Sequence, residues 1–306
     1  MTVLLQKMAL MLILLVLGYV AVRLKIVPED FNKGLSKLVI NVLLVGMILS
    51  SVINKELEMT GAEVAQGVLM MAIAQIIGIL TGVISAKLIP SLKRGDSGMY
   101  SMLIGFMNNG FMGFPLVAAF FGEDCVFFAS LSNIPFNLML YTIGIRMLQK
   151  GNGDEKLNLK RIINMPIIAT LAALIIFVFE IPMPAIIDDT MDTLSAAVVP
   201  LSMMCIGMSL GNVSIKDAVL QPKMYIVSLM RLIVAPLIAW LVLRMFITNP
   251  QTLGIIILLE LTPSAVICTM LGLENGRDGV ESSSGIFIST VLSVVTIPLM
   301  IALLGI

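Results

Sequence analysis

The chain has 306 residues, of which 58% are hydrophobic and 12% are charged, and its 19 basic side chains balance 19 acidic ones. A mean hydropathy of +1.05 lies far outside the range of water-soluble globular proteins of this length, so we exclude a soluble protein and expect no nucleic-acid partner. Histidine is absent, which excludes histidine-ligated metals, histidine-based triads and histidine proton relays. No metal site and no cofactor is expected.

Apolar stretches follow one another along almost the whole chain. A hydrocarbon core of about 30 Å requires roughly 20 residues of helix. The ten predicted spans are centred in Thr2–Val22, Leu38–Asn54, Val64–Ala86, Ser97–Gly122, Cys125–Ile145, Ile162–Phe179, Thr193–Ile215, Met224–Leu243, Thr252–Leu273 and Ser282–Ile306. The sequence therefore predicts an all-α membrane protein that crosses the bilayer ten times.

Basic residues are unevenly divided between alternate loops. One set of loops carries Arg23, Lys25, Lys33, Lys37, Lys87, Lys93, Arg94, Arg146, Lys150, Lys156, Lys160, Arg161, Lys216, Lys223 and Arg277. The other set has only Lys7, Lys55 and Arg244. Because basic loops stay in the cytoplasm, we expect a multi-pass protein of the cytoplasmic membrane with both termini extracellular or periplasmic.

A polar stretch near the middle divides the chain into two halves. Residues 149–161, QKGNGDEKLNLKR, have the composition of a cytoplasmic linker. They separate a first half, residues 1–148, from a second half, residues 162–306, with five predicted spans in each. An odd number of spans per half makes the second half enter the membrane from the opposite side, which is the condition for two inverted five-helix repeats.

The fourth span of each half contains helix-breaking residues. NNGFMGFP at 108–115 places Gly110, Gly113 and Pro115 at mid-membrane, and ELTPSA places Pro263 at the matching position. Since proline lacks an N–H group and clashes with the preceding turn, each helix is predicted to unwind just before Pro115 or Pro263 and to restart there, with Thr262 as an N-cap. An ordinary proline kink is the simpler alternative.

Two interruptions at bilayer depth predict a binding site. Unsatisfied backbone groups are costly in hydrocarbon, so they survive where protein or a wet cavity satisfies them. The restarted half-helices would point N–H groups and positive dipole ends at an anion, and freed carbonyl groups could hold a cation. The predicted substrate-binding residues of this region are Asn108, Asn109, Gly110, Gly113, Pro115, Thr262, Pro263 and Ser264.

Several motifs carry a resemblance to a known family. NNGFMGFPLVAAFFG (108–122), YTIG (141–144), LSKLVINVLL (35–44), PLSMMCIGMSLG (200–211), TPSAV (262–266) and STVLSVVTIPL (289–299) resemble the auxin efflux carrier family, in particular its bacterial malate- and malonate-permease-like members. The resemblance covers essentially the full chain. One departure is LLVGM around Val45, where the family commonly has a proline.

The resemblance implies a fold and a transport mechanism. It implies ten helices in two inverted five-helix repeats with crossed, discontinuous fourth and ninth helices, as in sodium/proton antiporter and bile-acid symporter folds. Spans one, two, six and seven would form a scaffold domain, compatible with a homodimer, and spans three to five and eight to ten would form a moving transport domain. It also implies elevator-type transport of small organic carboxylate anions, either malate- or malonate-like dicarboxylates or auxin-like monocarboxylates.

Two charged residues fall deep within predicted spans. Arg231 lies roughly 12 Å from the inner boundary near Lys223, and Glu260 roughly 14 Å from the outer boundary near Gln251, at about 1.5 Å of rise per residue. The two side chains are therefore at similar depths and could meet. A structural salt bridge is one hypothesis, and a coupling role, in which Glu260 exchanges a proton and Arg231 holds its charge or the substrate, is the other.

Neutral amides are the remaining polar groups in the spans. Amides can donate to a carboxylate and release it again, or they can join neighbouring helices. For Asn109 we favour a substrate contact, whereas for Gln75 contact between helices and a cation site stay equally open. Asn133 and Asn137 are further predicted substrate-binding residues. They share one helix face with Tyr141, and this stripe is predicted to line the interior of the transport domain.

We therefore predict a secondary transporter rather than an enzyme. No GxxxxGK[ST] motif occurs, so a gradient of H⁺ or Na⁺ would supply the energy. The alternatives are a lipid-modifying membrane enzyme, for which Asp188, Asp189 and Asp192 in a predicted outer loop are the candidate groups, and a sensor built on a transporter fold.

Overall fold

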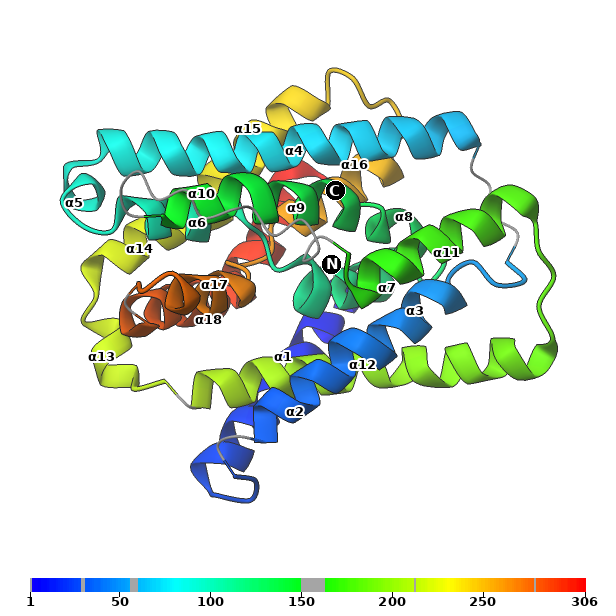
Figure 1. Cartoon of the computed structure of the whole chain (residues 1–306), viewed down its shortest axis with the longest axis horizontal. Helices are drawn as coiled ribbons and strands as arrows, with labels where there is room; N and C mark the ends of the chain where they lie inside the picture. The colour runs from blue at the N-terminus through cyan, green and yellow to red at the C-terminus, as the bar shows by residue number, and fades with distance from the viewer. Residues whose placement is uncertain (1, 29–30, 56–59, 150–162, 212, 278) are drawn as a thin grey trace. The chain divides into compact units, whose positions relative to one another are not determined.

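The computed structural model of the protein describes residues 2–28, 31–55, 60–149, 163–211, 213–277 and 279–306. Within these ranges the chain is helical and has no β-strand, apart from one isolated β-bridge (Figure 1). This confirms the all-α prediction. The predicted linker at 149–161 lies, beyond Gln149, outside the described residues.

Helices lie within every apolar segment that the sequence predicts. The first half contains α1 (Thr2–Arg23), α2 (Phe31–Leu38), η1 (Val39–Leu43), α3 (Leu44–Ser50), α4 (Gly61–Leu88), α5 (Pro90–Lys93), α6 (Ser97–Gly105), η2 (Asn109–Gly113), α7 (Phe114–Phe121), α8 (Cys125–Ser130), α9 (Asn133–Met139), η3 (Leu140–Gly144) and α10 (Ile145–Leu148). The second half contains α11 (Met165–Phe179), α12 (Ala185–Gly211), α13 (Ile215–Val219), α14 (Pro222–Leu229), η5 (Met230–Val234), α15 (Ala235–Leu243), α16 (Pro250–Glu260), α17 (Ile267–Glu274) and α18 (Gly279–Leu304). The elements labelled η are single π-helical turns.

Six helical stretches of the described chain are long and apolar enough to cross a membrane. They are Phe31–Ser50, Gly61–Leu88, Cys125–Leu148, Ala185–Gly211, Pro222–Leu243 and Gly279–Leu304. Shorter apolar helices occur at Ala9–Arg23, Asn109–Phe121, Met165–Phe179 and Pro250–Glu260. The chain is thus a multi-pass membrane protein, and the inverted relation of its halves stays a prediction.

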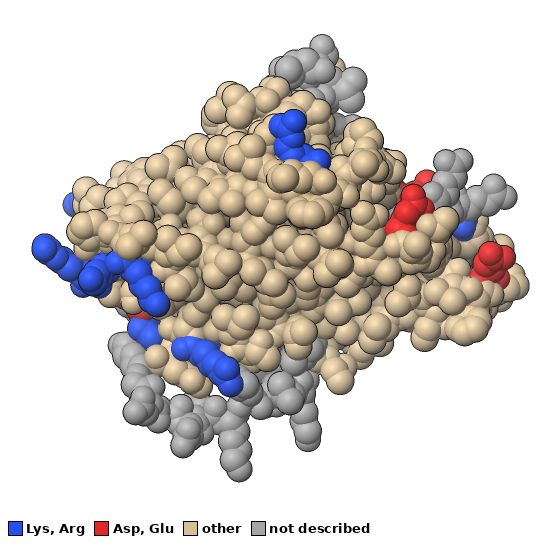
Figure 2. Space-filling view, turned by 90° about the horizontal axis from the view of Figure 1, so that it is seen from above, with Lys and Arg blue, Asp and Glu red and all other residues tan. Residues whose placement is uncertain are grey.

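Uncharged residues dominate the face seen in Figure 2, where lysine, arginine, aspartate and glutamate form only small groups. Many large apolar side chains are exposed, such as Ile13, Leu171 and Val295. An exposed apolar surface of this extent requires a lipid environment, since water would make it a site of aggregation.

The described chain divides into two compact units. Unit 1 comprises residues 1–68, 110–133 and 163–212, and unit 2 comprises residues 69–109, 134–162 and 213–306. Unit 1 therefore contains α1, α2, α3, α11 and α12, and unit 2 contains most of α4 together with α6 and α14 to α18. Each unit has its own buried apolar core.

Glycines allow the helices of unit 1 to approach closely. The helix α12 packs against α1 and α3, which lie beside it in Figure 1. A Cβ atom added at Gly207 would collide with the backbone oxygen of Leu15, and one added at Gly18 would collide with the backbone oxygen of Met204. Because lipid gives helices no hydrophobic reason to associate, this close contact between backbones is what makes α1 and α12 pack together.

Gly207→Ala should therefore destabilise unit 1. The new methyl group has no room beside Leu15, so we expect a loss of about 1–3 kcal/mol of unfolding free energy, measured by thermal unfolding of the purified protein in detergent. Gly34→Ala is the matched control, because nothing lies within 4 Å of its added Cβ. Equal stability of the two variants would contradict the close contact between α1 and α12.

The acidic residues predicted in an outer loop lie instead in a helix. The helix α12 begins at Ala185, eight residues before the predicted span, and so includes Asp188, Asp189 and Asp192. The Oδ2 atom of Asp188 accepts a hydrogen bond from Asn54 at 3.1 Å, and Oδ1 of Asp192 accepts one from Ser50 at 2.6 Å. The loop assignment was wrong because Asp188 lies in the positive first turn of α12, and because Asp188 and Asp192 bond to the turn after α3 and to α3 itself.

Candidate functional site

Two interruptions of helical segments meet within unit 2, at a place that we call the crossing. After α6 ends at Gly105 the backbone is extended at Phe106, and after α16 ends at Glu260 the chain is irregular until α17 begins at Ile267. The two interruptions form an antiparallel bridge between Met107 and Ser264. The backbone amide of Asn108 donates to the Pro263 carbonyl oxygen at 2.9 Å, and the backbone amide of Ala265 donates to the Phe106 carbonyl oxygen at 3.0 Å. The helices are thus held together by backbone hydrogen bonds at their interruptions.

The first interruption does not lie where the sequence predicted it. It lies at residues 106–108, whereas Pro115 is inside the first turn of α7, directly after the π-helical turn η2. The prediction of unwinding just before Pro115 was wrong for two physical reasons. The wider π-helical turn accommodates the proline ring, and pairing with the second interruption gives the Phe106 carbonyl group and the Asn108 amide partners outside their own helix.

The second helix unwinds before Pro263, as predicted, but it restarts at Ile267 and not at Pro263, and Thr262 does not cap the helix that follows. Its hydroxyl group donates to the Leu259 carbonyl oxygen at 2.7 Å, so it bonds to the helix that has just ended. The residue before α17 is Val266, which makes no side-chain capping bond. The new helix begins four positions after Pro263 because residues 263–265 pair with the first interruption.

Several backbone amides of the crossing already have partners. Besides the amides of Asn108 and Ala265, the amide of Ser264 donates to the Ser289 hydroxyl oxygen at 3.3 Å. The Ser264 hydroxyl group donates to the Leu103 carbonyl oxygen at 2.7 Å. These contacts correct the expectation of freely available amides, because the two interruptions satisfy each other. Polar side chains therefore become the more important candidates for contact with a ligand.

Arg231 and Glu260 meet at this crossing. The Nη2 atom of Arg231 lies 2.7 Å from Oε2 of Glu260, and the two side chains are 0% and 1% exposed. The pair is therefore fully removed from solvent, where an unpaired charge would be very costly. Arg231 and Glu260, for which the sequence predicted similar depths, are therefore in direct contact.

Arg231 also bonds to the ends of both interrupted helices. Its Nη1 donates to the Ile104 carbonyl oxygen at 3.0 Å, its Nε donates to that of Thr262 at 3.3 Å, and its Nη2 donates to that of Glu260. These carbonyl groups lie at the C-terminal ends of α6 and α16, where the helix dipole is negative. The Arg231 side chain thus stabilises the crossing by satisfying groups that the interruptions leave without helical partners.

Gln75 contributes to the same region. Its Nε2 donates to the Gly105 carbonyl oxygen at 2.7 Å, and its Oε1 is buried without a hydrogen-bond partner among the described residues. One turn along α4, a Cβ added at Gly78 would lie 3.1 Å from the Gly105 oxygen, 3.5 Å from Nη1 of Arg231 and 3.8 Å from Oε2 of Glu260. The α4 helix therefore lies directly against the end of α6 and the ion pair.

Sequence reasoning missed the π-helical turns, which position four of the polar residues. Asn41 lies in η1, Asn109 in η2, Tyr141 in η3 and Arg231 in η5. A π-helical turn adds a residue to the helix and changes the direction of the side chains that follow, and it is frequent at functional sites. Hydrophobic periodicity does not reveal it, since these segments are apolar on nearly every face and so have little periodicity to disturb.

The predicted site residues are divided between the two units. Asn108, Asn109, Asn137, Thr262, Pro263, Ser264, Gln75, Arg231 and Glu260 belong to unit 2. Gly110, Gly113, Pro115 and Asn133 belong to unit 1. Asn133 donates to Oγ1 of Thr170 on α11 at 3.4 Å, so its contact lies within unit 1. The crossing itself, with its ion pair and the buried Asn108 and Asn109, is therefore contained in one unit.

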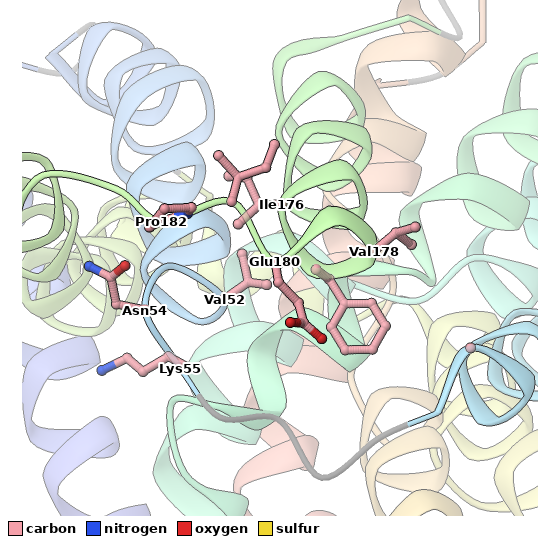
Figure 3. Close-up of a pocket in the computed structure, with 10 residues that line it drawn as sticks. Val52, Asn54, Lys55, Ile176, Val178, Glu180 and Pro182 are labelled. Atoms are coloured by element: carbon pink, nitrogen blue, oxygen red, sulfur yellow. The ribbon is translucent and has the colours of Figure 1, made fainter.

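Unit 1 contains a cavity that the sequence did not indicate. Its volume is about 650 Å³, and it lies between the turn after α3 and the C-terminal end of α11 (Figure 3). Val52, Ile176 and Pro182 contribute apolar walls, and Lys55 and Glu180 contribute the charged groups. None of the predicted site residues lines it. Its size suits a small molecule, and all of its lining residues belong to unit 1.

The architecture described above defines a class of protein. Interrupted helices that meet within a multi-pass helical membrane protein, with polar and charged groups buried at their ends, are typical of membrane transport proteins. The model of the family described as "Membrane transport protein" matches residues 3–158 and 152–301, and the chain belongs to this family. The match confirms the resemblance to auxin efflux carriers.

Two curated archaeal relatives support the same assignment. The chain is 29% identical over 293 residues to an uncharacterized transporter of Methanothermobacter thermautotrophicus, and 26% identical over 299 residues to an uncharacterized transporter of Methanocaldococcus jannaschii. Each alignment covers 94% of this chain and 94% of the relative. The similarity therefore extends over both halves of the chain.

Proposed function

We propose that the protein is a secondary active transporter of small organic carboxylate anions, with its anion site at the crossing in unit 2. The observation that carries the proposal is the paired interruption between Met107 and Ser264, since a transporter places its substrate where two discontinuous helices meet. Malate- or malonate-like dicarboxylates and auxin-like monocarboxylates are the candidate substrates.

The polar groups beside the paired interruptions support an anionic substrate. Asn108 and Asn109 are buried where the chain enters the helical stretch Asn109–Phe121. Their side-chain amides can donate to a carboxylate at a helix start, where the dipole is positive. Thr262, Pro263 and Ser264 supply the opposite side of the crossing, and Asn137 lies in the same unit. Gly110, Gly113 and Pro115 continue the chain from Asn109 into unit 1.

The division into two compact units supports an elevator-type mechanism. The paired interruptions lie in unit 2, so the candidate groups Asn108, Asn109 and Thr262 to Ser264 belong to one compact body, whereas Gly110, Gly113, Pro115 and Asn133 belong to unit 1. Unit 1 contains α1, α2, α3, α11 and most of the predicted seventh span in α12, which we propose as the scaffold, and it also contains α7 and α8, which the prediction assigned to the transport domain. Both termini outside the cytoplasm and a homodimer through the scaffold complete the proposed arrangement.

Uptake into proteoliposomes tests this function. The purified protein is reconstituted and offered a panel of radiolabelled mono- and dicarboxylates, with and without imposed H⁺ and Na⁺ gradients. We expect saturable uptake of one class of carboxylate, above that of protein-free vesicles. Flat uptake of every anion under every gradient would argue against an organic-anion transporter.

A further inference from the structure

The guanidinium group of Arg231 is surrounded by oxygen atoms of unit 2. A carboxylate oxygen of Glu260 lies at 2.7 Å, and the carbonyl oxygens of Ile104 and Thr262 lie at 3.0 and 3.3 Å. The backbone oxygen of Glu260 is a further acceptor. Arg231 itself is fully buried. Four hydrogen bonds thus engage Nε, Nη1 and Nη2.

This engagement leaves Arg231 little capacity to bind a substrate. A guanidinium group has five N–H donors in a fixed plane, and four are directed at atoms of the protein. A transported carboxylate would have to displace these contacts and leave several carbonyl groups unsatisfied at each cycle, which is costly in a buried site. The geometry therefore favours a fixed role for Arg231.

The same oxygen atoms have the chemistry of a monovalent-cation site. Carboxylate, backbone carbonyl and side-chain amide oxygens are the ligands of hard cations, and the C-terminal ends of interrupted helices coordinate such cations in transporters. Gln75 adds a buried Oε1 that has no partner within the described part of the chain, on a side chain that ends beside Gly105. The site thus offers one more buried oxygen than the hydrogen bonds of Arg231 use.

We propose that Arg231 is a built-in counter-cation, which fills an oxygen-lined site for a monovalent cation at the ends of α6 and α16. A covalently attached cation neutralises Glu260 and the two helix ends permanently, so no Na⁺ binds there in the native protein. If the proposed transport function holds, its coupling ion binds at a different site.

Removing the guanidinium should expose the cation site. We expect purified Arg231→Ala in detergent to melt at a lower temperature than the native protein in choline chloride. Titrating NaCl at constant ionic strength should then raise its melting temperature saturably, by roughly 5 °C. The native protein and Arg231→Lys should show no Na⁺-specific shift, because both retain a positive charge. Arg231→Ala combined with Glu260→Gln should lose the response, because the carboxylate ligand is gone.

Two results would overturn the proposal. One is an Arg231→Ala protein that melts at the same temperature in NaCl and in choline chloride. The other is a saturable Na⁺-specific stabilisation of the native protein that disappears in Glu260→Gln. Should Arg231→Ala fail to fold, Arg231→Gln removes the charge with less loss of volume and carries the same comparison. These readouts need no transport, so flat anion uptake would contradict the proposed function and leave this inference standing.

Discussion

Replacing Glu260 with alanine should lower the free energy of unfolding by about 3–5 kcal/mol. The substitution leaves the guanidinium of Arg231, which is 0% exposed, without the carboxylate at 2.7 Å. Removing one partner of a buried ion pair lowers stability by more than the pair contributes to it, because the remaining charge stays in a medium of low polarity. The measurement is equilibrium unfolding of the native and variant proteins in the same detergent.

A matched control uses a second ion pair of unit 2. Lys223 lies 3.8 Å from Glu281, and its side chain is 35% exposed. Lys223→Gln should therefore change the unfolding free energy by only about 0–1 kcal/mol. A loss for Glu260→Ala no larger than that of Lys223→Gln would mean that the pair with Arg231 does not stabilise the crossing.

Glu260 also separates the two roles that the sequence left open. Glu260→Gln keeps the shape and one acceptor oxygen of the side chain but cannot exchange a proton. If the pair is structural, transport by this variant should keep its full dependence on the imposed pH gradient. A variant that still binds anion but no longer responds to that gradient would instead place Glu260 in coupling.

Substituting Asn109 should weaken anion binding while the protein stays folded. Asn109 is buried at the start of η2, beside the paired interruptions. Loss of one hydrogen bond to a carboxylate corresponds to about 1.5–3 kcal/mol, so we expect Asn109→Ala to raise the dissociation constant of the transported anion roughly 10- to 150-fold. Isothermal titration with the anion identified by the uptake panel provides the measurement.

Asn41 offers the control for this experiment. It also lies in a π-helical turn, but it is exposed and donates to the Lys37 carbonyl oxygen of its own helix at 2.9 Å. Asn41→Ala should leave the anion affinity unchanged. An unaltered affinity in Asn109→Ala, with an unaltered melting temperature, would move the binding site away from η2.

The amino-acid sequence by itself determined the elements of this protein. Uncharged stretches of the required length predict membrane helices, because a backbone in hydrocarbon must satisfy its own hydrogen bonds. Pro263 correctly located the second interruption, since a proline has no N–H group to donate a helical hydrogen bond. The similar depths of Arg231 and Glu260 also follow from counting residues along two helices.

Only the tertiary structure decided which backbone groups of these elements form hydrogen bonds with one another. The first interruption lies at residues 106–108 because that backbone pairs with residues 263–265, which are more than 150 positions away. For the same reason, Arg231 bonds to Ile104 and Thr262, carbonyl groups on two other segments. Local sequence determines where a helix is able to break, whereas the partner that satisfies the broken backbone comes from elsewhere in the fold and is not encoded in any single segment.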